Sequence, residues 1–211
     1  FKGDRSAVYC FDEETGEFLW EFNLPKMGTG KVSDWEYLGI CSSPTIDGDR
    51  IYLVTNWCEA VCLDVHGMSN GNDGFQGEGA MMADRGQPPM EIKDTDADVI
   101  WKFNMIDECG VFPHNITSSS IVVADDLLWV STSNGVDYGH VETPAPNAPS
   151  LILLNKNTGE LVAEEQSGLS SRIFHCNWSS PAWLESQKLG IFGGPDGWVY
   201  AFETEPVKDE D

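Results

Sequence analysis

Apolar and polar residues alternate in short runs along most of this chain, and turn signals separate the runs. In the stretch 7–20, Val8 and Cys10 fall on one face of a predicted strand and Tyr9 falls on the other. Residues 12–16 predict a turn, because Asp bonds to nearby backbone and Gly accepts a positive φ. The stretch therefore predicts a β-hairpin, which needs further strands to bury its aromatic surface.

The same pattern recurs along the chain. Further strands and hairpins are predicted at 41–56, 60–65, 99–105, 118–135, 150–165 and 179–203. Two segments interrupt this series. Residues 66–98 are rich in Gly, Asn, Asp and Pro and show neither a strand nor a helix period, so we expect a flexible, solvated loop there. Residues 136–149 form a second insert, which is rich in Pro.

The predicted turns recur at a regular spacing. The residues that begin them, Asp12, Asp64, Asn155 and Glu203, lie 52, 91 and 48 positions apart. When inserts of about 29 and about 14 residues are left out, the middle spacing falls to about 48, which is typical of a four-stranded propeller blade. Stacked helical repeats are excluded, because the alternation has a period of two and helical runs are absent.

The predicted fold class is all-β, a partial β-propeller of four-stranded antiparallel blades. The strands suffice for about three blades, and we expect them to belong to a ring of seven or eight. We interpret 1–211 as a single propeller fragment. Its blade parts are about 1–24, 41–105 with the insert 66–98, 118–165 with the insert 136–149, and 179–203. Because three blades leave open edges, we expect the rest of a longer chain, or neighbouring chains, to complete the ring.

The charge of the chain is strongly negative. The formal net charge is −23, from 12 basic and 35 acidic residues. Such a field opposes binding to nucleic acid and to anionic membranes, and no apolar run approaches the ~20 residues of a membrane span. The 8 Trp, 10 Phe and 5 Tyr argue against disorder. An acidic solvated surface and a surface for a cationic partner both fit this composition.

The six cysteines form no CxxC pair and no haem-attachment motif. They are Cys10, Cys41, Cys58, Cys62, Cys109 and Cys176. Buried thiols in strands are one interpretation, and one or two disulfides in an oxidising compartment are another. A zinc site at Cys58 and Cys62 is a third, although no second pair follows them.

The order of strands in a blade assigns the loops to two rims. The segments 25–42, 104–117, 136–149 and 166–178 are expected to share one rim. The candidate rim site consists of Asp107, Glu108, His114, Asn115, Asp137, His140, Arg172 and His175. Histidine beside carboxylate can bind a metal or transfer protons, whereas the alternative is that these residues cap and pack loops.

The first insert is expected on the opposite rim, together with His66. Asn70, Asn72 and Asp73 offer the oxygen ligands that calcium prefers, but their spacing differs from that of an EF-hand loop. The tripeptides that begin at Asn115 and Asn177 match the acceptor pattern for N-glycosylation.

These residues resemble the pyrroloquinoline-quinone-like β-propeller repeat, which occurs in quinoprotein alcohol dehydrogenases and in the outer-membrane assembly lipoprotein propeller. The motif is a strand, an Asp, a Thr-Gly turn and a Trp. It stands as CFDEETGEFLW at 10–20 and, in degenerate form, as LLNKNTGELVA at 153–163. Within this family the chain looks most like the propellers of planctomycete-type bacteria.

The resemblance implies a structural motif in which the Trp of one blade docks on the next blade. Its residues here are Asp12, Thr15, Gly16, Trp20, Asp64, Trp101, Thr158 and Gly159. The third blade has Ala163 in place of the Trp. Pyrroloquinoline quinone and calcium are implied by the resemblance alone, and the adjacent cysteine pair that accompanies the quinone in the family is missing.

Three functions remain open from the sequence. The first is a binding or scaffold module without catalysis, located in the periplasm or outside a bacterial cell, whose partners are the rest of its propeller or neighbouring chains. The second is a quinoprotein-type oxidoreductase that passes electrons to a basic partner such as a cytochrome. The third is a calcium-dependent surface or filament component.

Overall fold

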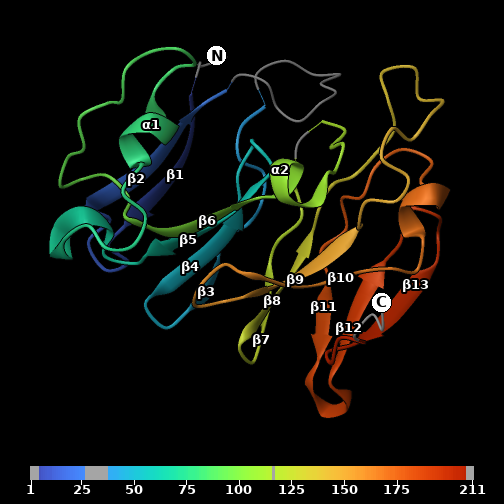
Figure 1. Cartoon of the computed structure of the whole chain (residues 1–211). Coiled ribbons are helices and arrows are strands. Elements are labelled where there is room, and N and C mark those ends of the chain that lie inside the picture. Colours follow the sequence, from blue (N-terminus) through green and yellow to red (C-terminus); the bar gives the residue numbers. More distant parts are fainter. Residues whose placement is uncertain (1–4, 27–37, 116, 208–211) are drawn as a thin grey trace.

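A computed structural model describes residues 5–26, 38–115 and 117–207. Within these ranges, four antiparallel sheets follow one another along the chain, with two, four, four and three strands (Figure 1). The first contains β1 (Arg5–Phe11) and β2 (Phe18–Pro25). The second contains β3 (Thr45–Asp47), β4 (Arg50–Val54), β5 (Glu59–Asp64) and β6 (Val99–Asn104). The third contains β7 (Val122–Ala124), β8 (Leu127–Ser131), β9 (Leu151–Asn155) and β10 (Leu161–Glu164). The fourth contains β11 (Ala182–Leu184), β12 (Leu189–Gly193) and β13 (Val199–Glu203).

Short helices lie between these strands. They are η1 (Gly67–Asn70), α1 (Glu78–Met82), α2 (Met105–Cys109), η2 (Leu169–Arg172) and η3 (Glu185–Gln187). Among the described residues, none of the helices has the length and apolar character needed to cross a bilayer. The strands pair in chain order within each sheet, which confirms the predicted partial β-propeller of four-stranded antiparallel blades.

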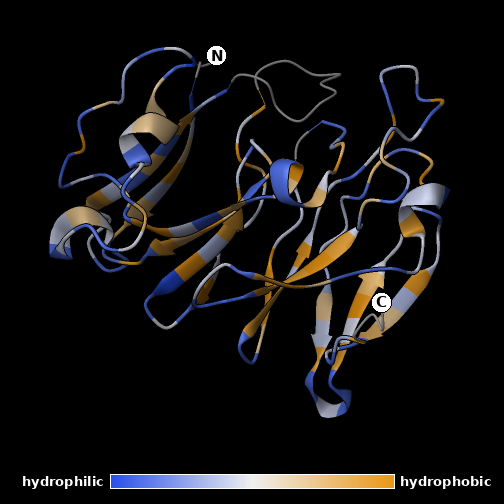
Figure 2. Ribbon diagram, viewed as in Figure 1, coloured by the Kyte–Doolittle hydropathy of each residue, from blue (hydrophilic) through white to orange (hydrophobic). Residues whose placement is uncertain are grey.

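The core consists of three layers, one at each junction between neighbouring sheets. Trp20, Phe22 and Leu53 are buried between the first and second sheets. Similar clusters join the second sheet to the third and the third to the fourth. In Figure 2 orange is concentrated on the strands, where it is interrupted by white and blue, whereas several hairpin turns are blue. The two-residue alternation predicts this mixture of colours within a strand, because successive side chains point to opposite faces.

The recurring turns use the same side-chain bond. Asp12, Asp64 and Asn155 each accept a hydrogen bond from the backbone N–H two residues further on. Gly16 and Gly159 follow in the left-handed conformation, at φ +71° and +73°. The Asp or Asn at each turn therefore begins the turn by local bonding, and the Gly completes it without steric cost.

Two tryptophans connect neighbouring sheets. Trp20 donates from Nε1 to the carbonyl of Val65 at 2.8 Å, and its ring lies against Gly67, where a Cβ would be 2.8 Å from the ring. Trp101 donates to the carbonyl of Lys156 at 3.0 Å and covers Gly159 in the same way. Each indole therefore spans one sheet junction with both an apolar face and a hydrogen bond.

The third junction lacks such a residue, because position 163 is alanine. Instead, the ring of Trp129 on β8 lies against Gly190 on β12, where a Cβ would be 2.4 Å from the ring. Trp129 is 2% exposed. A tryptophan from a different strand thus fills the junction, which the repeat pattern did not predict.

The segment 66–98 is exposed over much of its length, as predicted, but it is not without secondary structure or buried side chains. This segment contains η1 and α1, and Met68 and Met82 are buried. Its C-terminal part forms a parallel bridge between Asp96 and Glu21 of β2. The insert therefore lies along the edge of the first sheet. Its few apolar residues are separated by Gly and Pro, so they show no period in the sequence although they are buried.

The carboxylate of Asp98, in the insert, is buried with only part of its hydrogen-bonding capacity used, which costs stability when it is charged. Asp98 is 1% exposed, and within the described residues its Oδ1 atom accepts no hydrogen bond. Burial raises the pKa of Asp98 to about 6, and the negative charge of Glu78 adds to the shift. Since the folded state holds the proton more tightly, the stability from this group is present below about pH 4 and is lost as the pH rises through about 6.

We therefore expect Asp98→Asn to raise the free energy of unfolding at pH 7.5 by about 1–2 kcal/mol. The gain is smaller than the full effect of the pKa shift, because Asn accepts more weakly from the N–H of Asp73. Urea titrations of wild type and Asp98→Asn at pH 4 and pH 7.5 measure the difference in the free energy of unfolding. The two proteins should differ little at pH 4, and an equal difference at both pH values would contradict this account.

Candidate functional site

Three histidines from three loops meet on one rim of the sheets. His114 precedes β7, His140 lies between β8 and β9, and His175 lies between β10 and β11. Their ring centroids are 4.5–4.9 Å apart, and one ring nitrogen of each lies within 4.8 Å of the other two. The assignment of loops to rims predicts a shared rim, and the structure adds direct ring contact.

Backbone hydrogen bonds hold these loops together. Pro113 pairs with Asn134, and Gly135 pairs with Cys176, as isolated β-bridges. The N–H of Val136 donates to the carbonyl of His175 at 2.9 Å. A Cβ at Gly135 would lie 2.6 Å from the Cβ of His114, so this crossing of loops needs glycine. The rings are therefore carried by a cross-linked backbone.

The hydrogen bonds of the rings identify their protonated nitrogens. His114 is fully buried, and its Nδ1 donates to the carbonyl of Val136 at 2.7 Å. The Nδ1 atom of His140 donates to the carbonyl of Tyr138 at 3.1 Å. Because a carbonyl only accepts, both Nδ1 atoms carry hydrogen, and the lone pair of each neutral ring lies on Nε2. The Nε2 atoms of His114 and His175 are 3.0 Å apart.

Trp178 and Cys176 flank His175 in different ways. The ring of Trp178 lies 4.9 Å from that of His175, edge to face. The Sγ atom of Cys176 donates to the carbonyls of His114 and Ser133. Burial raises the pKa of Cys176 to about 12, so the sulfur is a thiol in the folded protein. The contact of Trp178 with His175 could not be predicted from the sequence, in which Trp178 stands out only by its place two residues after Cys176.

The carboxylate of Asp137 organises the loop that carries His140. It accepts hydrogen bonds from the N–H groups of Val141 and Glu142. These bonds hold the pKa of Asp137 below its usual value. Asn115, which follows His114, is buried and has a left-handed backbone at φ +58°. Both predicted residues thus support the loops that carry the histidines.

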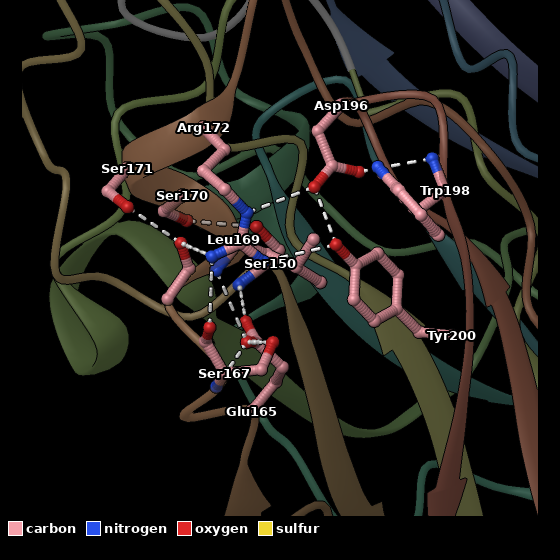
Figure 3. A network of polar contacts seen from close by, with 11 residues as sticks. Ser150, Glu165, Ser167, Leu169, Ser170, Ser171, Arg172, Asp196, Trp198 and Tyr200 are labelled. Atoms are coloured by element: carbon pink, nitrogen blue, oxygen red, sulfur yellow. Dashed lines mark hydrogen bonds and ion pairs between the residues drawn. The ribbon is translucent and has the colours of Figure 1, made fainter.

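The other predicted rim residues have different contacts. Asp107 accepts from the side chain of Asn104 at the start of α2, and Glu108 is exposed on that helix. Figure 3 shows Arg172 directed toward Asp196 and Tyr200. Its Nε is 3.0 Å from a carboxylate oxygen of Asp196, and its Nη1 donates to two carbonyls before η2. Arg172 therefore links η2 to the fourth sheet. The predicted rim segment 25–42 lies partly outside the described residues.

Both glycosylation motifs are inaccessible in the folded chain. Asn177 is 1% exposed and donates to the carbonyl of Ser150, and Asn115 is 4% exposed. A glycan needs a solvent-exposed asparagine. The match to the acceptor pattern is therefore coincidental in the folded state.

All six cysteines have free thiols in the structure. Burial raises the pKa of Cys58, Cys62 and Cys109 to about 12, as it does for Cys176. Such thiols are unreactive and pack like small apolar side chains.

The donor atoms of the rim site differ from those that a quinone and calcium site requires. The three histidines are the only group of three or more His, Cys, Asp or Glu side chains within ligating distance in the part of the chain that the structure describes. Imidazole suits zinc, copper, nickel and iron, whereas calcium takes oxygen ligands. The three histidines therefore suit a metal of the zinc class rather than calcium, and the sequence lacks an adjacent cysteine pair for the quinone.

Asn72, a candidate calcium ligand in the first insert, has another role. Its side-chain oxygen accepts from Gln76, and the N–H of Asp73 donates to Asp98. These bonds close the turn between η1 and α1.

No protein-family model and no curated protein matches this chain. Several solved structures do match it at low sequence identity. A europium-containing methanol dehydrogenase has a TM-score of 0.56 at 12% identity over 93% of this chain and 36% of its own. The quinohemoprotein alcohol dehydrogenase of Comamonas testosteroni has a TM-score of 0.53 at 10% identity, and the match covers 90% of this chain and 26% of that enzyme. The quinohemoprotein alcohol dehydrogenase ADHIIG of Pseudomonas putida HK5 has a TM-score of 0.53 at 11% identity, and the match covers 92% of this chain and 26% of that enzyme.

This chain thus spans about a quarter to a third of these enzymes. At such identities the likeness concerns the fold and carries no information about residues of the site. The sheets of this chain accordingly share the fold of a segment of a quinoprotein-type β-propeller.

Proposed function

We propose that this chain is part of a propeller that acts outside the cytoplasm as a binding module, and that the rim with the three histidines is its binding surface. The observation that supports this most is the cross-linking of the rim loops. Asn134 joins three of them, since it pairs with Pro113 and donates from Nδ2 to Ala145 and Ser170. A preorganised surface loses little conformational entropy on binding.

The side chains on these loops suit a protein partner. Tyr138 and Phe174 are 65% and 80% exposed, and Trp178 is 38% exposed. Exposed aromatic residues are enriched at protein interfaces. The net charge of −23 favours association with a basic partner. Catalysis with a quinone is not part of this proposal, because the sequence lacks the adjacent cysteine pair that accompanies the quinone in the family.

Site-specific photo-cross-linking tests the binding surface. Benzoylphenylalanine replaces Tyr138 on the histidine rim of the full-length protein, and in a control it replaces Asp126, in the β7–β8 turn on the opposite rim. After irradiation in the native host, we expect a discrete adduct from position 138 and none from position 126. Equal adducts from both positions, or none from either, would contradict the proposal.

The location outside the cytoplasm has its own test. Cys41 is exposed, whereas the other five cysteines are buried or partly buried. A maleimide that cannot cross the inner membrane should therefore label the full-length protein in intact cells, and Cys41→Ser should remove most of the label. Because partial desolvation of the Cys41 sulfur raises its pKa although the residue is exposed, the labelling is carried out at pH 8.5. Labelling only after the cells are permeabilised would place the protein in the cytoplasm.

The closer likeness to planctomycete-type propellers, the ring of seven or eight blades and the domain limits stay predictions. The full-length reading frame tests the blade number and the domain limits, since it shows how many times the Asp, Thr-Gly and Trp motif recurs.

A further inference from the structure

We propose that His114, His140 and His175 together bind one divalent transition-metal ion of the zinc class, with a further coordination position open to solvent. This inference goes beyond the binding surface proposed above, because it concerns an ion and requires no protein partner. It rests on the distances, the hydrogen bonds and the burial of the three rings.

The distances agree with a tetrahedral site. At Zn–N bonds of about 2.0–2.1 Å, two nitrogens of a tetrahedral zinc site lie about 3.3–3.4 Å apart. The Nε2 atoms of His114 and His175 are 3.0 Å apart and share one hydrogen, which an ion would displace, and the three donor nitrogens all lie within 4.8 Å of one another. The exposed His140 would approach the ion by a small shift of its ring that keeps the Nδ1–H bond to the carbonyl of Tyr138.

The hydrogen bonds orient the rings for metal binding. His114 and His140 each donate from Nδ1 to a backbone carbonyl, at Val136 and Tyr138 respectively. Metal-binding histidines are commonly held in this way, because the bond selects the tautomer and presents the lone pair of Nε2 to the ion. Both carbonyls belong to the loop 136–140, so one segment orients two rings.

The burial of the rings places the ion at the surface. His114 is buried, His175 is partly buried and His140 is exposed. An ion among them would therefore lie near the protein surface, beside the exposed ring of His140. Three protein ligands with an open fourth position are typical of zinc sites that bind water or an exogenous ligand. Cys176 faces the backbone carbonyls of His114 and Ser133, so a sulfur ligand is not available beside His175.

The charge around the site favours a cation. The protein carries a net charge of −23, and the carboxylate of Asp137 lies three residues before His140. The alternative is that the rings serve only in packing and hydrogen bonds within the protein. Packing alone predicts no affinity for zinc and no specific effect of removing one ring.

Isothermal titration calorimetry of the EDTA-dialysed full-length protein with ZnCl₂ tests the proposal. We expect one site with a dissociation constant of about 1 μM or lower, an increase in melting temperature on zinc addition, and no response to CaCl₂. In a second measurement, Co²⁺ should give the visible absorption of a tetrahedral nitrogen site.

The variants are His140→Ala and His66→Ala. His140 is exposed, so its removal should leave the fold intact, which the melting temperature of the metal-free variant checks. We expect His140→Ala to weaken zinc binding at least ~100-fold. His66→Ala, which removes the histidine outside the cluster, should leave the zinc dissociation constant within about twofold of the wild-type value. Wild-type protein without zinc affinity at 100 μM ZnCl₂, or equal affinity of wild type and His140→Ala, would overturn the proposal. Neither result would affect the cross-linking from position 138, so the two proposals fail separately.

Discussion

Trp20→Ala is expected to lower the free energy of unfolding of the full-length protein by about 3–5 kcal/mol. Trp20 is 2% exposed and packs among the side chains between the first and second sheets. Its truncation leaves a cavity at the junction and removes the hydrogen bond to the carbonyl of Val65. Guanidinium chloride titration of wild type and variant measures the loss.

Trp198→Ala is the matched control, because it makes the same chemical change at a side chain that is 71% exposed. Substitutions of exposed side chains usually change stability by no more than ~0.5 kcal/mol. If the two variants lost equal stability, or if Trp20→Ala also stayed within this range, the indole would not connect the sheets as described.

The second large effect concerns the glycine beneath the other connecting tryptophan. Gly159→Ala is expected to destabilise the protein by at least ~2 kcal/mol more than Gly16→Ala. Both glycines have nearly the same left-handed backbone, at φ +73° and +71°. The cost of ~1–2 kcal/mol for an alanine in that conformation is therefore common to the two variants.

Only the surroundings of the two glycines differ. A Cβ at position 159 would lie 2.6 Å from the ring of Trp101, whereas a Cβ at position 16 would meet no atom within 4 Å. Urea titration of the two variants in parallel isolates the effect of this contact, and the near-UV circular dichroism of Gly159→Ala should change as Trp101 moves. Equal destabilisation of the two variants would show that the ring adapts without cost.

The candidate site could be predicted from the sequence only as a set of residues on one rim. The order of strands places His114, His140 and His175 in loops at the same end of the sheets, and this much follows from counting strands. Their contact depends on Gly135 and on the pairing of Asn134 with Pro113, which join residues that are distant in the chain. The same counting placed Arg172 and Asp107 on the rim, where they form other contacts.

The repeat is a property of the sequence itself. The alternation of side chains, the Asp or Asn that starts each turn and the Gly that completes it all act within a few residues, so local chemistry alone predicts the strands and their order. The partial β-propeller follows, because strands that alternate apolar and polar residues at a regular period can bury their apolar faces only against neighbouring sheets.

Only the tertiary structure decided the contacts between distant segments. The insert 66–98 lies along β2, Trp129 fills the junction that Ala163 leaves, and three histidines from three loops meet within 4.8 Å. These contacts depend on the shape and burial of surfaces that form after the sheets assemble. Packing of this kind has no period along the chain, which is why it cannot be predicted from sequence patterns alone.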